Sequence, residues 1–127
     1  MTIKRHTDPS NTLTTLTAAG QLTPDEFVEV VKAFEDDPPA RKILWDCREA
    51  YPADSFNSAY TREIAELAKA TVGLRREGKT AFVAVSDVSF GMCRMYTSQL
   101  EVKGALHSMK VFRDMDEALK WLREEDG

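Results

Sequence analysis

Polar side chains that could bind an anion follow the short apolar runs of the sequence. Arginine binds phosphate or carboxylate groups through paired hydrogen bonds, and the unpaired N–H groups at a helix N-terminus attract the same groups. The other interpretation is that the aspartates and serines cap helices while the arginines form ion pairs with them. The candidate ligand-binding residues are Asp46, Arg48, Asp54, Ser55, Ser86, Asp87 and Arg113.

The sequence contains none of the spacings that mark common catalytic, metal or cofactor sites. Cys47 and Cys93 have no cysteine or histidine at ligand spacing, and isolated thiols of a cytosolic protein are usually reduced. His6 and His107 adjoin no nucleophile motif, although the fold could still bring a histidine to Cys47. None of the six glycines belongs to a phosphate-binding loop. We therefore expect no enzyme activity, no metal and no cofactor.

Charge and hydropathy argue against several classes of partner. The net charge is −4, and 17 basic residues are scattered among 21 acidic ones, so we expect no nucleic-acid surface. No apolar run reaches the roughly 20 residues that span a bilayer, and the first residues lack the apolar segment of a signal peptide. With 43% hydrophobic residues, we expect a cytoplasmic protein without membrane insertion, folded as a single domain over residues 1–127.

The first third of the sequence predicts a β-hairpin followed by a helix. Two threonine-rich stretches, residues 2–7 and 12–17, are separated by Asp8-Pro9-Ser10-Asn11, whose residue types favour a turn. Thr23 is followed by a proline and, three positions on, by a glutamate, which is the pattern of a capped helix start. Apolar residues spaced three and four apart continue this helix until two prolines at 38 and 39 end it.

The remaining sequence alternates strands with helices. Short apolar runs between polar loops are typical of buried parallel strands, and a capping pattern from Asp114 to Glu117 opens the last helix. The order β-β-α-β-α-β-α-β-α implies parallel strands joined by right-handed crossovers, and hence an α/β fold. Strands are predicted at residues 42–46, 80–85 and 107–112, a loop at 47–57, and helices at about 58–75, 88–102 and from 114 onward.

Three segments carry a resemblance to a known family. They are residues 44–48 (LWDCR), 85–96 (VSDVSFGMCRMY) and 110–122 (KVFRDMDEALKWL). With the order of elements, they resemble the bacterial STAS/SEC14-domain proteins of the sporulation anti-sigma-antagonist type over the whole chain. The resemblance implies a STAS-like right-handed β-α superhelix around a mixed five-stranded sheet. Relatives include phosphorylation-switched regulators, nucleotide-binding modules and lipid carriers, so the resemblance does not by itself specify a function.

The same resemblance directs attention to a phosphorylation site. In anti-sigma antagonists an Asp-Ser-Ser-Gly motif leads into the helix after the third strand, and its second serine is phosphorylated. Asp54-Ser55-Phe56-Asn57 occupies a similar place, so Phe56 stands where that serine is expected. Ser55 and Ser58 are the candidate phosphorylation residues, because negative charge is tolerated at a helix N-terminus. The alternative is that these serines are ordinary helix caps.

Phe90 is an aromatic residue that the predicted core does not explain. At about 100° per residue it points away from the apolar face of its helix, and Arg94 follows one turn later. An exposed ring beside an arginine is typical of an interface, so Phe90 and Arg94 are candidate interface residues. The alternative is that Phe90 folds under a neighbouring loop. The predicted core face consists of Val88, Met92, Met95, Tyr96 and Leu100.

These features favour a non-enzymatic regulatory or scaffolding module that binds a protein partner or a second copy of itself. The alternative function is the binding of a small anion or nucleotide at the carboxyl edge of the sheet. Lipid carriage fits poorly, because the chain is too short to supply helices that wall a lipid cavity. A hydrolase would need catalytic groups brought together from distant parts of the sequence.

Overall fold

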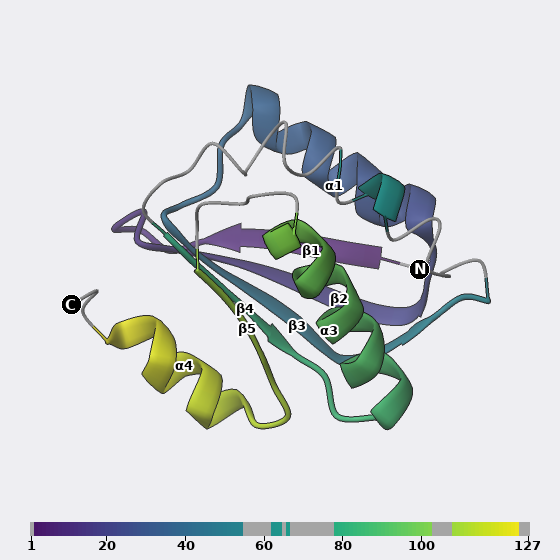
Figure 1. Cartoon of the computed structure of the whole chain (residues 1–127). Coiled ribbons are helices and arrows are strands. Elements are labelled where there is room, and N and C mark those ends of the chain that lie inside the picture. The colour runs from purple at the N-terminus through teal and green to yellow at the C-terminus, as the bar shows by residue number, and fades with distance from the viewer. Residues whose placement is uncertain (1, 55–61, 65, 67–77, 103–107, 125–127) are drawn as a thin grey trace.

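The computed structural model describes residues 2–54, 62–64, 66, 78–102 and 108–124. Residues 62–64 and 66 are helical. The remaining elements, labelled in Figure 1, are β1 (Thr2–Thr7), β2 (Leu13–Leu22), α1 (Pro24–Asp36), β3 (Lys42–Pro52), β4 (Lys79–Val83), α3 (Asp87–Val102), β5 (Ser108–Phe112) and α4 (Met115–Arg123).

The five strands form one sheet in the order β1-β2-β3-β4-β5. β1 runs antiparallel to β2, and each later pair of neighbours is parallel. The strand order steps in one direction, and parallel crossovers are right-handed in nearly all known proteins, which places connecting helices on one face of a sheet. α1 and α3 accordingly contribute to the same core. Among the labelled helices, α4, which follows the last strand of this sheet, covers the opposite face (Figure 1). The predicted mixed five-stranded α/β fold is confirmed.

β4 is buried on both faces and joins two hydrophobic cores. All five of its residues are buried. Phe82 points into the larger core, which contains Phe27 and Trp45. Ala81 and Val83 point into the second core under α4. This alternation follows from the two-residue period of a strand, and it explains why the sequence of β4 reads as continuously apolar after its first two residues.

The predicted hairpin turn and first helix start are both present. The Asp8 carboxylate accepts hydrogen bonds from the Thr12 hydroxyl at 2.6 Å and from the Thr12 backbone N–H at 2.7 Å. The Thr12 hydroxyl, followed by the Leu13 N–H, lowers the pKa of Asp8 from 3.8 to about 2. At α1, the Thr23 hydroxyl accepts the Glu26 N–H while the Glu26 carboxylate accepts the Thr23 N–H, which completes the expected capping box.

The predicted loop over residues 47–57 is wrong for its first part, because β3 continues to Pro52. β2 is also longer than the predicted 12–17, and it pairs with β3 as far as Leu22 with Pro52. Beyond the end of β4, β2 and β3 continue to pair with each other. Their polar side chains in that part face solvent, so the sequence there shows no apolar pattern from which a strand could be predicted. β4 ends at Val83, two residues earlier than expected. Most of the predicted helix 58–75 lies outside the described residues.

Lys79, the first residue of β4, is a buried cation that holds the end of α4. Its side chain is only 5% exposed. Nζ donates to the carbonyl oxygens of Trp121 at 2.8 Å and Glu124 at 2.9 Å, and it lies 4.9 Å from the centre of the Trp121 ring. A cation is favoured at this end of a helix because the last carbonyl groups lack the usual hydrogen bond from an N–H four residues on and carry partial negative charge.

We predict that Lys79→Ala lowers the free energy of unfolding by about 1–3 kcal/mol, because two partly buried hydrogen bonds from a charged donor to the end of α4 are lost. Urea denaturation followed by circular dichroism measures this change. Lys120→Ala, on an exposed position of α4, is the matched control and should change stability by less than about 0.5 kcal/mol. Equal midpoints for the two variants would contradict the assigned role of Lys79.

Candidate functional site

The carboxyl ends of β4 and β5 form an edge at which several candidate residues meet. β4 and β5 end together, with Val83 beside Phe112. Val83 also lies beside Asp46, from which β3 continues to Pro52. α3 starts from this edge, and the Ser86 hydroxyl accepts the Ser89 N–H at 3.1 Å. Ser86 therefore caps α3, which is one of the two roles open to it from the sequence.

Arg113 organises the cluster at this edge. It forms an ion pair with Asp87 at 2.9 Å and donates to the Val85 carbonyl oxygen at 3.0 Å. Its guanidinium carbon lies 4.3 Å from the centre of the Phe90 ring, and that of Arg94 lies 6.0 Å away. Phe90 is half-buried, which agrees with the expectation that part of the ring stays exposed. These four side chains, Asp87, Phe90, Arg94 and Arg113, are called the Phe90 cluster below.

Asp46 and Arg48 form a second pair on β3. Arg48 donates from Nε and from Nη2 to the two carboxylate oxygens of Asp46, each at 2.9 Å. The bond from Arg48 lowers the pKa of Asp46, against the opposing effect of burial. Among the described residues, no hydrogen bond or ion pair connects this pair to the Phe90 cluster. The structure therefore places the two candidate arginines in separate ion pairs.

The remaining candidates are less well placed for a shared site. Asp54 is exposed two residues after the end of β3. Ser55 and Ser58 lie outside the described residues, so their geometry is not part of the site. Metal ligands are not gathered in the described ranges, where no group of three acidic, histidine or cysteine side chains could hold an ion. No described helix is long and apolar enough to cross a bilayer.

Sequence reasoning missed three exposed apolar residues, one near the end of β3 and two between the end of β4 and the first turn of α3. Tyr51 is 56% exposed, Val85 54% and Val88 67%. The Ser89 hydroxyl donates to the Ala50 carbonyl oxygen at 3.3 Å, which holds the start of α3 against the end of β3. Val85 and Val88, together with the Phe90 cluster, are called the edge surface below, whereas Tyr51 lines the cavity between β3 and α3.

The predicted core face of α3 is wrong at its first member, Val88. The residues of α3 that are buried are Ser89, Tyr96, Thr97 and Leu100, so the buried face is rotated by one position at the start of the helix. α3 begins beyond the end of β4, and its first turn has less of the sheet beneath it than its last. An apolar residue in that turn can therefore face solvent, although helical spacing alone assigns it to the core.

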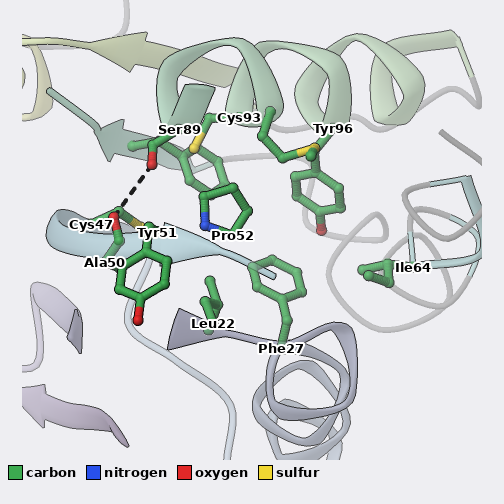
Figure 2. Close-up of a pocket in the computed structure, with 12 residues that line it drawn as sticks. Leu22, Phe27, Cys47, Ala50, Tyr51, Pro52, Ile64, Ser89, Cys93 and Tyr96 are labelled. Carbon is green, nitrogen blue, oxygen red and sulfur yellow. Dashed lines mark hydrogen bonds between the residues drawn. The ribbon is translucent and has the colours of Figure 1, made fainter. Parts of the chain in front are cut away.

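An apolar cavity of about 60 Å³ lies between the ends of β2 and β3, α1 and α3, and Figure 2 shows the side chains around it. Aromatic rings form one wall, with Phe27 and Tyr96 in edge-to-face contact at 5.1 Å between ring centres. Phe27 also stacks on Trp45 at 4.7 Å. The lining comes from elements far apart in the sequence, so no local pattern predicts it. The lining residues are Leu22, Phe27, Cys47, Ala50, Tyr51, Pro52, Ile64, Phe82, Ser89, Met92, Cys93 and Tyr96.

Cys47 and Cys93 meet at this cavity. Contact with the Cys93 side chain and burial both raise the pKa of the Cys47 thiol well above its usual range. Cys47 is buried and Cys93 is half-buried. A thiol whose pKa is raised is mostly protonated at neutral pH and is a poor nucleophile. Cys47 therefore lacks the activation that a catalytic cysteine needs.

Burial raises the pKa of Tyr96 well above its usual range. In the unfolded chain Tyr96 ionises near its ordinary pKa of about 10, whereas in the folded protein it stays neutral. The folded state should therefore keep its full stability below that pH and lose stability as the pH rises towards the folded pKa.

We predict that Tyr96→Phe removes the loss of folding stability that Tyr96 causes at alkaline pH, because phenylalanine has no group to ionise. Urea midpoints measured at about pH 8 and about pH 11 test it. Tyr51→Phe, at the exposed end of β3, is the control, and it should lose as much stability at alkaline pH as the wild type does. A Tyr96→Phe variant that loses as much stability as the wild type would show that Tyr96 ionises in the folded state.

Comparisons with known proteins identify the fold. No family model matches the chain, and no curated protein matches it. Among solved structures, an anti-sigma factor antagonist from Mycobacterium paratuberculosis is 12% identical, covers 97% of this chain and 96% of its own, and has a TM-score of 0.60. An uncharacterized DUF3478 protein with a SpoIIAA-like fold from Shewanella loihica PV-4 is 16% identical over 95% and 92% of the two chains, with a TM-score of 0.57.

A third similar structure is the unphosphorylated anti-sigma factor antagonist SpoIIAA. It is 12% identical, covers 99% of this chain and 100% of its own, and has a TM-score of 0.56. The TM-scores and coverage of these structures establish a shared fold, whereas identities this low leave function open. The fold predicted from the three resembling segments, that of the sporulation anti-sigma antagonists, is confirmed.

Proposed function

We propose that this protein is a non-enzymatic regulatory module that binds a protein partner through the edge surface. The observation that carries the proposal is the arrangement of Phe90, whose ring is held by Arg113 at 4.3 Å while it remains partly exposed. Aromatic and arginine side chains are enriched at the energetically important centres of interfaces. A ring already fixed in position loses little conformational entropy when a partner covers it.

The apolar residues around Phe90 support the same proposal. Val85 and Val88 are more than half exposed. Val85 lies in the link between β4 and α3, and Val88 lies in the first turn of α3. Single exposed apolar residues are ordinary, but a group of them rimmed by charges is typical of a docking surface. Asp87, Arg94 and Arg113 supply the charged rim.

The similar structures agree with this class of function. Two of them are anti-sigma factor antagonists, which are regulators that act on another protein. The fold thus serves protein binding without catalysis in proteins of similar architecture. A protein partner for this chain is an inference from the edge surface together with that shared fold.

The alternative function, small-anion or nucleotide binding at the same edge, has less support. Arg113 is paired with Asp87 and Arg48 with Asp46, so an incoming anion would have to displace a carboxylate from either arginine. Phosphorylation of Ser55 or Ser58 is a separate proposal that rests on the resemblance alone. The intact mass of protein isolated from its host would test it.

We predict that Phe90→Ala weakens capture of a host protein partner at least about tenfold while changing stability by only about 1 kcal/mol. Quantitative mass spectrometry of proteins retained on the immobilised wild type and variant measures capture, and urea denaturation measures stability. Phe82→Ala, which removes a buried ring, should instead cost about 3–5 kcal/mol.

Val102→Ala provides the matched control for capture. Val102 is the last residue of α3, 88% exposed, and belongs to the opposite end of the helix from the edge surface. Partners that the wild type and Val102→Ala retain equally, and that Phe90→Ala loses, support the proposal. If Phe90→Ala captures the same proteins as the wild type, or is as unstable as Phe82→Ala, the edge surface is not the binding site.

A further inference from the structure

Arg94 is an exposed cation beside Phe90, and no carboxylate in the described part of the chain forms an ion pair with it. Its guanidinium carbon lies 6.0 Å from the centre of the Phe90 ring. The residues four positions away on either side along α3, Phe90 and Ser98, are not acidic. The Arg94 guanidinium is therefore available to bind an anionic group of another molecule.

Arg113, the other cation beside the ring, already has an acidic partner. Its guanidinium lies 2.9 Å from the Asp87 carboxylate. The next carboxylate along the chain, Asp114, caps the start of α4. The two arginines beside Phe90 are thus matched by one paired aspartate, which leaves an excess positive charge at Arg94. The protein as a whole carries a net charge of −4, so this positive charge differs in sign from the average of the molecule.

We propose that the partner bound at the edge surface presents a carboxylate next to an apolar side chain. The carboxylate pairs with Arg94, and the apolar side chain packs on the exposed part of the Phe90 ring. The inference rests on the proposed function, because it names the chemistry of the partner that the edge surface would bind.

Two physical effects favour a carboxylate over an uncharged group at this position. Arginine and a carboxylate can form two parallel hydrogen bonds, which are stronger than bonds between neutral groups. A partner that covers Phe90 also removes water from around Arg94, and the attraction between opposite charges is stronger where water is excluded. A partner with an uncharged side chain there would remove water from the guanidinium without replacing its hydrogen bonds, which disfavours binding.

A displayed library of random peptides, selected on the immobilised wild-type protein, tests the proposal. Peptides that bind the wild type but not Phe90→Ala are ligands of the edge surface. Among them, an aspartate or glutamate next to an aromatic or aliphatic residue should be enriched relative to the unselected library. Val102→Ala, at the exposed far end of α3, should bind the same peptides as the wild type.

A double-mutant cycle with one selected peptide isolates the contribution of Arg94. The peptide is synthesised with its acidic residue and with the matching amide, and titration calorimetry measures both affinities. Arg94→Ala should weaken binding of the acidic peptide about tenfold and should hardly change binding of the amide peptide, which lacks the charge. Arg94→Lys should keep part of the affinity, because lysine retains the charge but not the paired hydrogen bonds.

Arg123→Ala is the matched control, because it removes an exposed arginine from α4, on the opposite face of the sheet. It should bind both peptides as the wild type does, and urea denaturation establishes that each variant is folded. Ligands that depend on Phe90 but show no enrichment of acidic residues would overturn the inference and leave the proposed function standing. If the change from acid to amide costs the wild type and Arg94→Ala equally, a different group binds the carboxylate. If no selected peptide depends on Phe90, the proposed function fails, and the inference fails with it.

Discussion

The burial of β4 on both faces is the constraint on which the rest of the structure depends. Phe82 contributes to one core, while Ala81 and Val83 contribute to the other, so the strand couples α1 and α3 to α4 through the sheet. Lys79, the first residue of β4, donates a hydrogen bond to the end of α4. Val83, its last residue, lies at the edge of the sheet where α3 begins. A change in β4 would therefore disturb both cores and both ends of the sheet.

The sequential strand order determines where an interaction surface can form. Because the crossovers place their helices on one face, the carboxyl ends of β4 and β5 meet the N-terminus of α3 at one edge. Arg113, which directly follows β5, reaches Asp87 and Phe90 of α3 across that edge. Both charged groups are substantially exposed, so their ion pair adds little to stability and mainly orients the ring.

The edge surface and the cavity share α3 but use different sides of it. Phe90 and Arg94 belong to the edge surface, whereas Cys93 and Tyr96 line the cavity. The Ser89 bond to Ala50 holds the first turn of α3 against the extended end of β3, next to both regions.

The sequence by itself determined the elements with strong local signals: the Asp8 turn, the Thr23 capping box and the continuously apolar β4. These depend on neighbouring residues, so short stretches of sequence specify them. Only the tertiary structure decided the extension of β3 to Pro52, which rests on pairing with β2, and the exposure of Val88, which rests on where the sheet ends beneath α3. The same holds for the cavity that Cys47 and Cys93 both line, because contacts between elements distant in the sequence leave no periodic pattern in either element.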